Sequence, residues 1–303
     1  MNKNMTALVS AFARAYHYKN NDKSIFSDNV AEKIITVEEY KSIYLNMAKG
    51  ISFFNPQFSG SEDEAVRWIV NNYLSPSPIG RSVFTENKLE LEVRLGVKQY
   101  LIFASGYDTF AYRQEAYSKN INIFEIDKPE MIDDKIKRIK EYVDEIDNIN
   151  FVKIDFEKDK ILDKLLDTDM FDKDKKSICS LLGISYYLGK EDFVSMISEI
   201  SSVVPEGSSI VFDYPDENYY TSNAGERAKK QIMMASAAGE VMKSSYSYKE
   251  LEKILSERGF LIYEHLTPGE ITKEYFGDYN KKNPTNMITA FDNVNYLFTV
   301  KKN

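Results

Sequence analysis

From Gly96 onward, short apolar runs alternate with amphipathic segments, and this alternation constrains the fold more than any other feature of the sequence. Each run is rich in β-branched or aromatic residues and almost continuously apolar, as strands covered on both faces are. The segments between the runs carry apolar residues at helical spacing. The pattern predicts an α/β protein with an open, mostly parallel sheet and helices on both faces. Seven strands are predicted, over 98–104, 121–127, 150–155, 177–183, 208–214, 260–266 and 295–301.

The first ninety residues lack this alternation and are predicted to be helical. Ser61 and Glu64 form a capping box ahead of one helix, and a second helix is predicted over 85–95. Later helices are predicted from Pro129, over 190–203, and from Ser247 to Gly259. We expect a single domain with four parts: a helical N-terminal part (1–95), a cofactor-binding core (96–214), an inserted segment (215–246) and the C-terminal part of the core (247–303).

Composition excludes several classes of protein. A net charge of −8, with lysines interleaved among acidic residues, argues against nucleic-acid binding, which needs a concentrated basic face. The single cysteine, Cys179, excludes a multi-cysteine metal site, and we expect no bound metal. Because the chain has neither an apolar stretch of membrane-spanning length nor a secretory signal pattern, we expect no membrane association and a cytoplasmic location.

Parallel sheets bind ligands at the carboxyl ends of their strands, which directs attention to the loop after the first strand. Small residues at Ala104, Ser105 and Gly106 allow close approach of a ligand to the backbone. Asp127 ends the next strand, where an acidic residue can accept hydrogen bonds from a ribose diol. The nicotinamide dinucleotide fingerprint needs three glycines, whereas here Thr109 and Ala104 replace two of them. An adenosyl ligand without pyrophosphate, S-adenosylmethionine, is therefore favoured over NAD.

Several motifs in order along the chain carry a resemblance to a known family. They are 11–18 and 26–34, Arg81 within 80–84, Gly106 with Asp108, Thr109, Tyr112 and Arg113, the sequence FEIDKPE at 124–130, VKIDF at 152–156, Gly183 with Tyr187 and Leu188, and PEGSS at 205–209. In these motifs the chain resembles the leucine carboxyl methyltransferase family, including its bacterial members linked to polyketide O-methylation.

The resemblance implies a Rossmann-like class I methyltransferase fold and an S-adenosylmethionine-dependent O-methyltransferase. It implies that Asp127 holds the ribose hydroxyls and that Asp155 accepts from the adenine amino group. It also implies that Arg14 and Arg81 bind the methionine carboxylate, to which a guanidinium fork is well suited. The full set of expected cofactor-binding residues is Arg14, Arg81, Ala104, Ser105, Gly106, Asp108, Asp127, Asp155, Phe156 and Leu182.

Two residues depart from the family pattern. Ala104 stands where the family usually has glycine, and Leu182 stands where it usually has glutamate. The leucine removes a carboxylate expected to face the charged methionine end, and losing one charge-assisted hydrogen bond costs roughly 1.5–3 kcal/mol. An alternative therefore stays open: a protein that keeps the fold and weak cofactor binding but has lost catalysis.

The acceptor is expected to be a small apolar metabolite with a carboxylate or hydroxyl, a polyketide-like compound being one candidate. A carboxylate is ionised at neutral pH and needs no base, whereas a hydroxyl gains from one. Neither His17 nor His265 lies within a recognised catalytic element, which favours a carboxylate. The catalytic residues are not identified; the candidates for the acceptor pocket are Tyr112, Tyr186 and Tyr187. The Met-rich segment 215–246 is either an ordinary packed helix or a lid over the acceptor.

Overall fold

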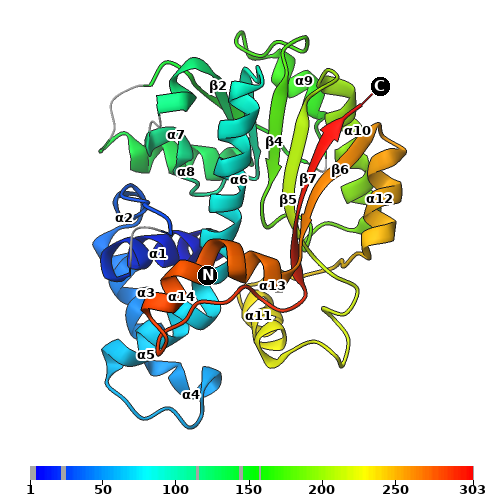
Figure 1. Cartoon of the computed structure of the whole chain (residues 1–303). Helices are drawn as coiled ribbons and strands as arrows, with labels where there is room; N and C mark the ends of the chain where they lie inside the picture. Colours follow the sequence, from blue (N-terminus) through cyan, green and yellow to red (C-terminus); the bar gives the residue numbers. More distant parts are fainter. Residues whose placement is uncertain (1–4, 22–24, 114–115, 143–145, 157, 303) are drawn as a thin grey trace.

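The computed structural model describes residues 5–21, 25–113, 116–142, 146–156 and 158–302. Over these residues the chain forms a seven-stranded sheet in the order β3-β2-β1-β4-β5-β7-β6, as Figure 1 shows. The first five strands are parallel, and β7 runs antiparallel to both of its neighbours. The predicted α/β class and mostly parallel sheet are confirmed. The strands are β1 (Gln99–Phe103), β2 (Asn122–Asp127), β3 (Ile149–Lys153), β4 (Ser177–Leu181), β5 (Ser209–Pro215), β6 (Phe260–Leu266) and β7 (Val294–Lys301).

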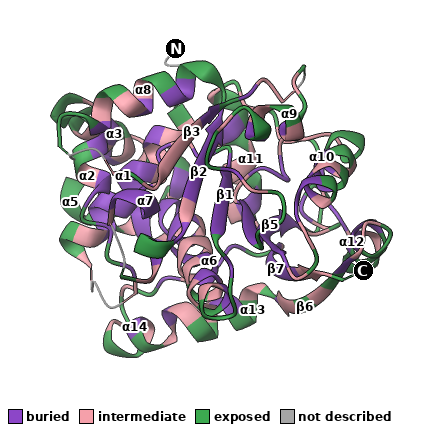
Figure 2. Ribbon diagram, turned by 90° about the horizontal axis from the view of Figure 1, so that it is seen from above, coloured by how far each residue is buried: buried purple, intermediate pink, exposed green. Residues whose placement is uncertain are grey.

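The central strands are buried on both faces, which explains their continuous apolar runs. Successive side chains of β1 point to opposite faces: Tyr100 and Ile102 join one apolar cluster, and Leu101 and Phe103 join the other. The first cluster includes α1 and α6, and the second includes α10 and α12. Figure 2 shows the buried strands running between the two layers of helices.

The N-terminal part is helical as predicted, but its last helix is much longer than expected. The predicted helix over 85–95 is wrong at its start, because the helix already begins at Pro76, a residue that the first turn accommodates. The capping box is confirmed: the Ser61 side chain accepts from Glu64 N, and the Glu64 carboxylate accepts from Ser61 N at 2.8 Å. The helices are α1 (Met5–Asn20), α2 (Ala31–Ile34), α3 (Val37–Lys49), α4 (Ile51–Phe54), α5 (Glu62–Ile69), η1 (Val70–Leu74) and α6 (Pro76–Arg94).

The helices of the core follow the predicted alternation with the strands. The helix predicted over 190–203 has the observed bounds, and Pro129 opens another as predicted. No described helix is both long enough and apolar enough to cross a membrane. These helices are α7 (Phe110–Arg113), η2 (Ala116–Asn120), α8 (Pro129–Ile139), α9 (Ile161–Leu166), α10 (Lys190–Val203), α11 (Glu226–Ala237), α12 (Tyr248–Ser256), α13 (Pro268–Ile271), η3 (Thr272–Phe276) and α14 (Gly277–Lys282).

The N-terminal helices and α11 lie beyond one end of the sheet, below the strands in Figure 1. This is the end where the parallel strands finish, because the loop after β1 meets α1: a Cβ on Gly106 would lie 3.6 Å from the Cβ of Ala7. The fold therefore covers the carboxyl ends of the strands with helices from two distant parts of the chain.

Candidate active site

The loop that follows β1 is held open by backbone conformation and by a carboxylate from the next strand. Ala104 and Gly106 both have φ of 47°, in the left-handed region. The Asp127 side chain accepts hydrogen bonds from Gly106 N at 2.8 Å and from Lys128 N at 2.7 Å. These bonds join the ends of β1 and β2 into one wall. Ala104 takes the conformation that a glycine would favour, which costs an alanine roughly 1 kcal/mol.

Two polar groups of this wall are nearly enclosed. Burial raises the pKa of Asp127, and the hydrogen bonds from Gly106 and Lys128 partly oppose the rise. The Ser105 hydroxyl is buried and makes no hydrogen bond with any residue that the structure describes. An enclosed carboxylate beside an unsatisfied hydroxyl suits a ligand rich in hydroxyl groups, such as a ribose.

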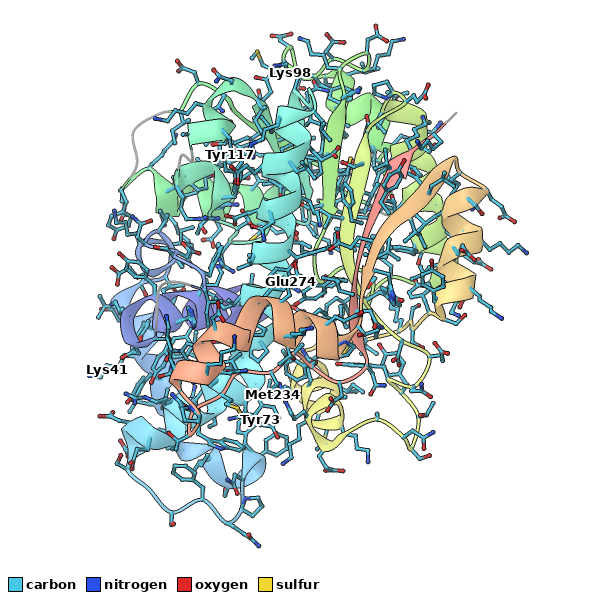
Figure 3. All side chains as sticks on the ribbon, in the orientation of Figure 1. Lys41, Tyr73, Lys98, Tyr117, Met234 and Glu274 are labelled. Atoms are coloured by element: carbon cyan, nitrogen blue, oxygen red, sulfur yellow. The ribbon has the colours of Figure 1, made fainter. Side chains whose placement is uncertain are left out.

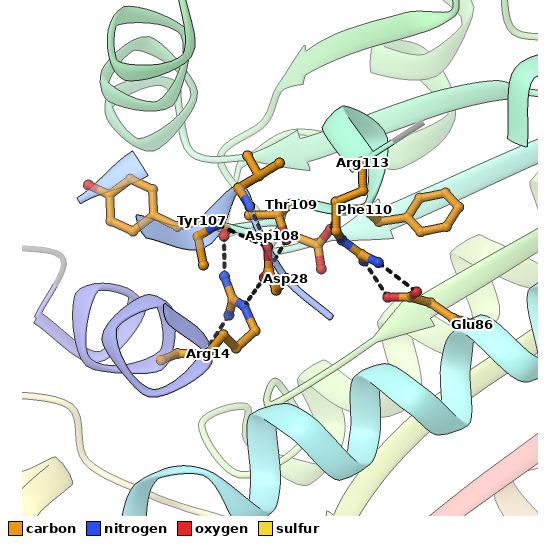
Figure 4. Close-up of polar contacts among 11 residues, drawn as sticks. Arg14, Asp28, Glu86, Tyr107, Asp108, Thr109, Phe110 and Arg113 are labelled. Atoms are coloured by element: carbon orange, nitrogen blue, oxygen red, sulfur yellow. Dashed lines mark hydrogen bonds and ion pairs between the residues drawn. The ribbon is translucent and has the colours of Figure 1, made fainter. Parts of the chain in front are cut away.

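A buried ionic network fastens this loop to the N-terminal helices (Figure 4). Asp28 accepts from Arg14 Nε at 2.9 Å and from Thr109 Oγ1 at 2.7 Å, and Arg14 also donates to Ser10 Oγ and to the carbonyl of Tyr107. Burial acts to raise the pKa of Asp28, but the nearby Arg14 and the hydrogen bonds outweigh it and hold the pKa below its usual value. Three of the guanidinium's five N–H groups are thus already used.

Two adjoining cavities open at this end of the sheet. The first, of about 250 Å³, is lined by the loop after β1, by Asp127 and by Leu182, and is called here the polar cavity. The second, of about 400 Å³, is lined by apolar side chains that include Val9, Ile43 and Met234, and is called the apolar cavity. The two share one wall, formed by Thr6, Ser10, Pro78, Arg81, Gly183 and Tyr187.

Arg81 stands in that shared wall and is held by a carboxylate at the end of β5. Asp213 accepts from Arg81 Nη1 at 3.5 Å, from Gly183 N at 2.6 Å and from Tyr186 Oη at 3.1 Å. Burial acts to lower the pKa of Arg81, but the Asp213 carboxylate outweighs it, so the pKa is raised and the guanidinium stays charged. A Cβ on Gly183 would lie 2.4 Å from Arg81 Nη1, so only glycine leaves room for this contact.

The inserted segment 215–246 is both packed and part of the cavity wall. Its helix α11 is anchored at its start, where the half-buried Arg227 donates to the carbonyls of Asn72 and Thr289, each at 2.9 Å. Further along, Met234 lines the apolar cavity and lies beside Tyr73, another lining residue, in Figure 3. Movement of the segment as a lid stays a prediction.

The structure brings most of the predicted cofactor-binding residues together. Asp155 and Phe156 are not among the described residues that line the polar cavity: Asp155 pairs with Lys158 at 2.6 Å, and the Phe156 ring lies 6.5 Å from that of Phe103. Their role at the adenine stays a prediction. The predicted residues that do line this cavity are Arg14, Arg81, Ala104, Ser105, Gly106, Asp108, Asp127 and Leu182.

The acceptor-pocket prediction needs one correction. Tyr186 and Tyr187 line the apolar cavity, but Tyr112 lines neither cavity. The Tyr112 side chain is buried beneath the loop, where its hydroxyl donates to Glu125 at 3.0 Å. Sequence analysis missed Asp213, although it falls near the end of a predicted strand and the rule for strand ends would have found it.

No histidine that the structure describes lines either cavity. His17 is buried in α1, and His265 contacts the Tyr214 hydroxyl at 2.8 Å on β6. The described residues contain no group of side chains suited to hold a metal ion. The arrangement instead offers a pocket for a polar ligand that opens onto a pocket for an apolar one.

Comparison with known proteins agrees with this arrangement. The family model for leucine carboxyl methyltransferases matches residues 7–201. The chain is similar to YktD of Bacillus subtilis (strain 168), a protein named as an S-adenosyl-L-methionine-dependent methyltransferase, with 39% identity over 304 residues and 98% of each chain covered.

Two solved structures share the fold. A DUF574 family protein from Streptomyces avermitilis gives a TM-score of 0.61 at 13% identity, covering 96% of this chain and 97% of that one. A protein from Thermobifida fusca, whose name also describes a methyltransferase, gives 0.57 at 13% identity, covering 98% and 94%.

Proposed function

The chain belongs to the leucine carboxyl methyltransferase family and is an S-adenosylmethionine-dependent methyltransferase, and from this premise we propose that it methylates an oxygen, in the first place a carboxylate, of a small apolar metabolite. The observation that carries the proposal is the wall shared by the polar and apolar cavities. A methyl donor and its acceptor must occupy adjoining pockets, because the transfer requires their reacting atoms in line and in contact.

On the cofactor side, the residues present suit S-adenosylmethionine. Asp127 would accept hydrogen bonds from the ribose hydroxyls, the small residues Ala104 and Gly106 would leave room beside it, and Ser105 would supply a free hydroxyl. Arg81 would pair with an anionic group at the junction, since its Nε and Nη2 make no hydrogen bond with a described residue. When bound, S-adenosylmethionine supplies a methyl group already activated by its sulfonium.

On the acceptor side, the lack of a free base among the described lining residues favours a carboxylic acid. Arg81 and Asp213 are the only charged side chains among the described residues that line the apolar cavity. A carboxylate acceptor is ionised at neutral pH and needs no base. A hydroxyl acceptor gains from a base, and Asp213 is the one carboxylate at hand, but three donors already bind it and weaken it in that role.

The remaining lining of the apolar cavity suits an irregular apolar skeleton. Met47, Met234 and Met242 contribute flexible, polarisable side chains, and Leu74 and Tyr186 add rigid apolar surface. Such a pocket fits a hydrophobic acid, of which polyketide-like acids are one class. The alternative, a protein that keeps the fold and weak cofactor binding but has lost catalysis, would bind S-adenosylmethionine without transferring its methyl group.

Product chemistry tests the proposal. The purified protein is incubated with methyl-labelled S-adenosylmethionine and a panel of apolar carboxylic acids, with matched alcohols and phenols as controls. We expect a labelled product that releases methanol in mild base, because methyl esters hydrolyse and phenolic ethers do not. A base-stable product would move the reaction to a hydroxyl and assign Asp213 the role of base.

A further inference from the structure

Glu240 reaches the polar cavity from the inserted segment, through the turn that ends α11. Gly239 has φ of 84°, its N–H donates to Ser236 O at 3.0 Å, and Glu240 N donates to Ala235 O at 2.9 Å. This is the glycine-capped pattern that closes a helix and reverses the chain. The reversal places Glu240 in the lining of the polar cavity, together with the loops of the sheet.

Of the acidic side chains that line this cavity, Glu240 alone has no partner within the described part of the chain. Asp127 accepts from Gly106 N and Lys128 N, and Asp108 accepts from Phe110 N at 2.8 Å. Glu240 makes no side-chain hydrogen bond or ion pair with a described residue. A carboxylate in a partly enclosed pocket is stabilised by a cation, so its lack of a partner points to a charged ligand.

The carboxylate lies near the shared wall. Burial raises the pKa of Tyr187, and the negative charge of Glu240 raises it further, while the positive charge of Arg81 opposes the rise. Both charges therefore act on one tyrosine, which itself lines both cavities. On the sheet side, the same cavity is lined by the apolar Leu182, which supplies no charge.

An amino-acid group carries one positive and one negative charge, and S-adenosylmethionine ends in such a group. Within the described part of the chain, Arg81 has N–H groups left for a carboxylate, and Glu240 has both oxygens left for an ammonium. We propose that Glu240 binds the α-ammonium group of the methionine portion of S-adenosylmethionine. Binding of this ammonium group by Glu240 does not depend on whether the acceptor is a carboxylate or a hydroxyl.

The position of Glu240 connects the inserted segment 215–246 to the cofactor. The carboxylate belongs to the chain that follows α11, whose side chains line the apolar cavity. An ion pair between Glu240 and the cofactor therefore links cofactor binding to the placement of the acceptor pocket's wall.

Calorimetry on Glu240→Gln tests the proposal with two ligands. S-adenosylhomocysteine carries the ammonium group, and 5′-methylthioadenosine has the same nucleoside and a neutral thioether but lacks the amino-acid portion. Neither ligand carries a sulfonium, so their charges differ only at the amino-acid group. We expect Kd for S-adenosylhomocysteine to rise about tenfold or more, because a charge-assisted bond is lost. Kd for 5′-methylthioadenosine should change less than about twofold. Glu226→Gln, on the exposed start of α11 and paired with Lys229, is the matched control and should change neither value.

Two outcomes would overturn the proposal. An unchanged affinity of Glu240→Gln for S-adenosylhomocysteine would mean that the ammonium is held elsewhere. An equal loss with both ligands would mean that Glu240 acts only on the shape of the cavity. Neither measurement uses an acceptor, so an error in the proposed carboxyl chemistry would leave these ratios unaffected. The melting temperature of the variant, expected to equal that of the parent, checks that it is folded.

Discussion

At the scale of single residues, the two departures from the family pattern have different consequences. Ala104 keeps the left-handed conformation that the loop needs, and the bond from Gly106 N to Asp127 is formed regardless. The extra methyl group is therefore accommodated at the cost of backbone strain alone. Leu182 does remove a carboxylate from the polar cavity, but Glu240 lines the same cavity and supplies another.

Asp127 is the residue on which cofactor binding should depend most directly. We predict that Asp127→Ala weakens S-adenosylmethionine binding by about 2 kcal/mol, roughly thirtyfold in Kd, because an ionic acceptor of hydrogen bonds is removed. Calorimetry measures the change. Asp133→Ala, which removes an exposed carboxylate from α8, is the control and should leave Kd unaltered. Equal affinities for both variants would show that the ribose is held elsewhere.

At the scale of elements, the packing of the N-terminal helices against the sheet depends on one buried carboxylate, that of Asp28. Asp28 accepts from Val30 N and Ala31 N at the start of α2, from Arg14 in α1 and from Thr109 beyond β1. Three segments thus meet at a single ionised group. Because α1 lines both cavities, the state of Asp28 bears on the site as well as on stability.

The pH dependence of the free energy of unfolding should show the contribution of the Asp28 carboxylate. The pKa of Asp28 lies below its ordinary value of 3.8 in the folded protein. Ionisation therefore stabilises the fold above the unfolded-state pKa, and that contribution is lost as the pH falls through the lower folded-state value. We predict that Asp28→Asn lowers the free energy of unfolding by about 3 kcal/mol at neutral pH, since Arg14 loses its buried partner.

Denaturant unfolding at several pH values checks this prediction. The difference in the free energy of unfolding between the parent protein and Asp28→Asn should narrow as the pH falls from about 5 to about 2. Over this range the parent loses the ionised carboxylate, which the variant already lacks. A gap that stays constant over this range would show that the carboxylate does not titrate with folding.

We expect the mobility of helix α11 to change more on ligand binding than that of the other elements. It is anchored at Arg227, while residues from 231 onward form the wall of the apolar cavity. We predict that the amides of 231–243 exchange readily in the free protein and are protected when cofactor and acceptor are both bound. Hydrogen exchange measures this, with the buried strand β5 as the internal reference. Full protection of 231–243 in the free protein would make the segment a static wall.

At the scale of the whole molecule, the sheet and its covering helices form one binding unit. The carboxyl ends of β1, β2, β4 and β5 supply the floor, and α1, α3, η1, α6 and α11 supply most of the remaining walls of the two cavities. The site is therefore assembled from residues far apart in the sequence, from Met5 to Met242. A ligand that fills it contacts, and so stabilises, distant parts of the chain at once.

Thermal unfolding should report this stabilisation. S-adenosylmethionine at about one hundred times its Kd should add about 2.7 kcal/mol to the free energy of unfolding and raise Tm by several degrees. NAD at the same concentration should leave Tm unchanged, because the loop after β1 lacks the glycines that a pyrophosphate needs. A rise in Tm with NAD and no rise with S-adenosylmethionine would contradict the assignment of S-adenosylmethionine as the cofactor.

The strands and the position of the site were predictable because their signals are local. The run at 260–266 matches β6 at both ends, and the loop from Ala104 to Gly106 is marked by small residues at the end of an apolar strand. Burial on both faces requires a continuous apolar run, and a close ligand contact requires small side chains. Both requirements are visible in a few neighbouring residues, so the sequence by itself determined the fold class and the edge of the sheet that carries the site.

The partners of each charged residue were decided only by the tertiary structure. Nothing near Arg81 in the sequence indicates that Asp213 will hold it, or that Glu240 will line the same cavity. Likewise, no local pattern shows that Tyr112 stays out of both cavities. Its burial against Glu125 depends on how α7 packs on β2. Such contacts join residues far apart in the chain, and whether a charge is paired, buried or free depends on the packing of whole elements. The physical reason is that desolvation and Coulomb interactions act through space, whereas periodicity and turn chemistry act along the chain.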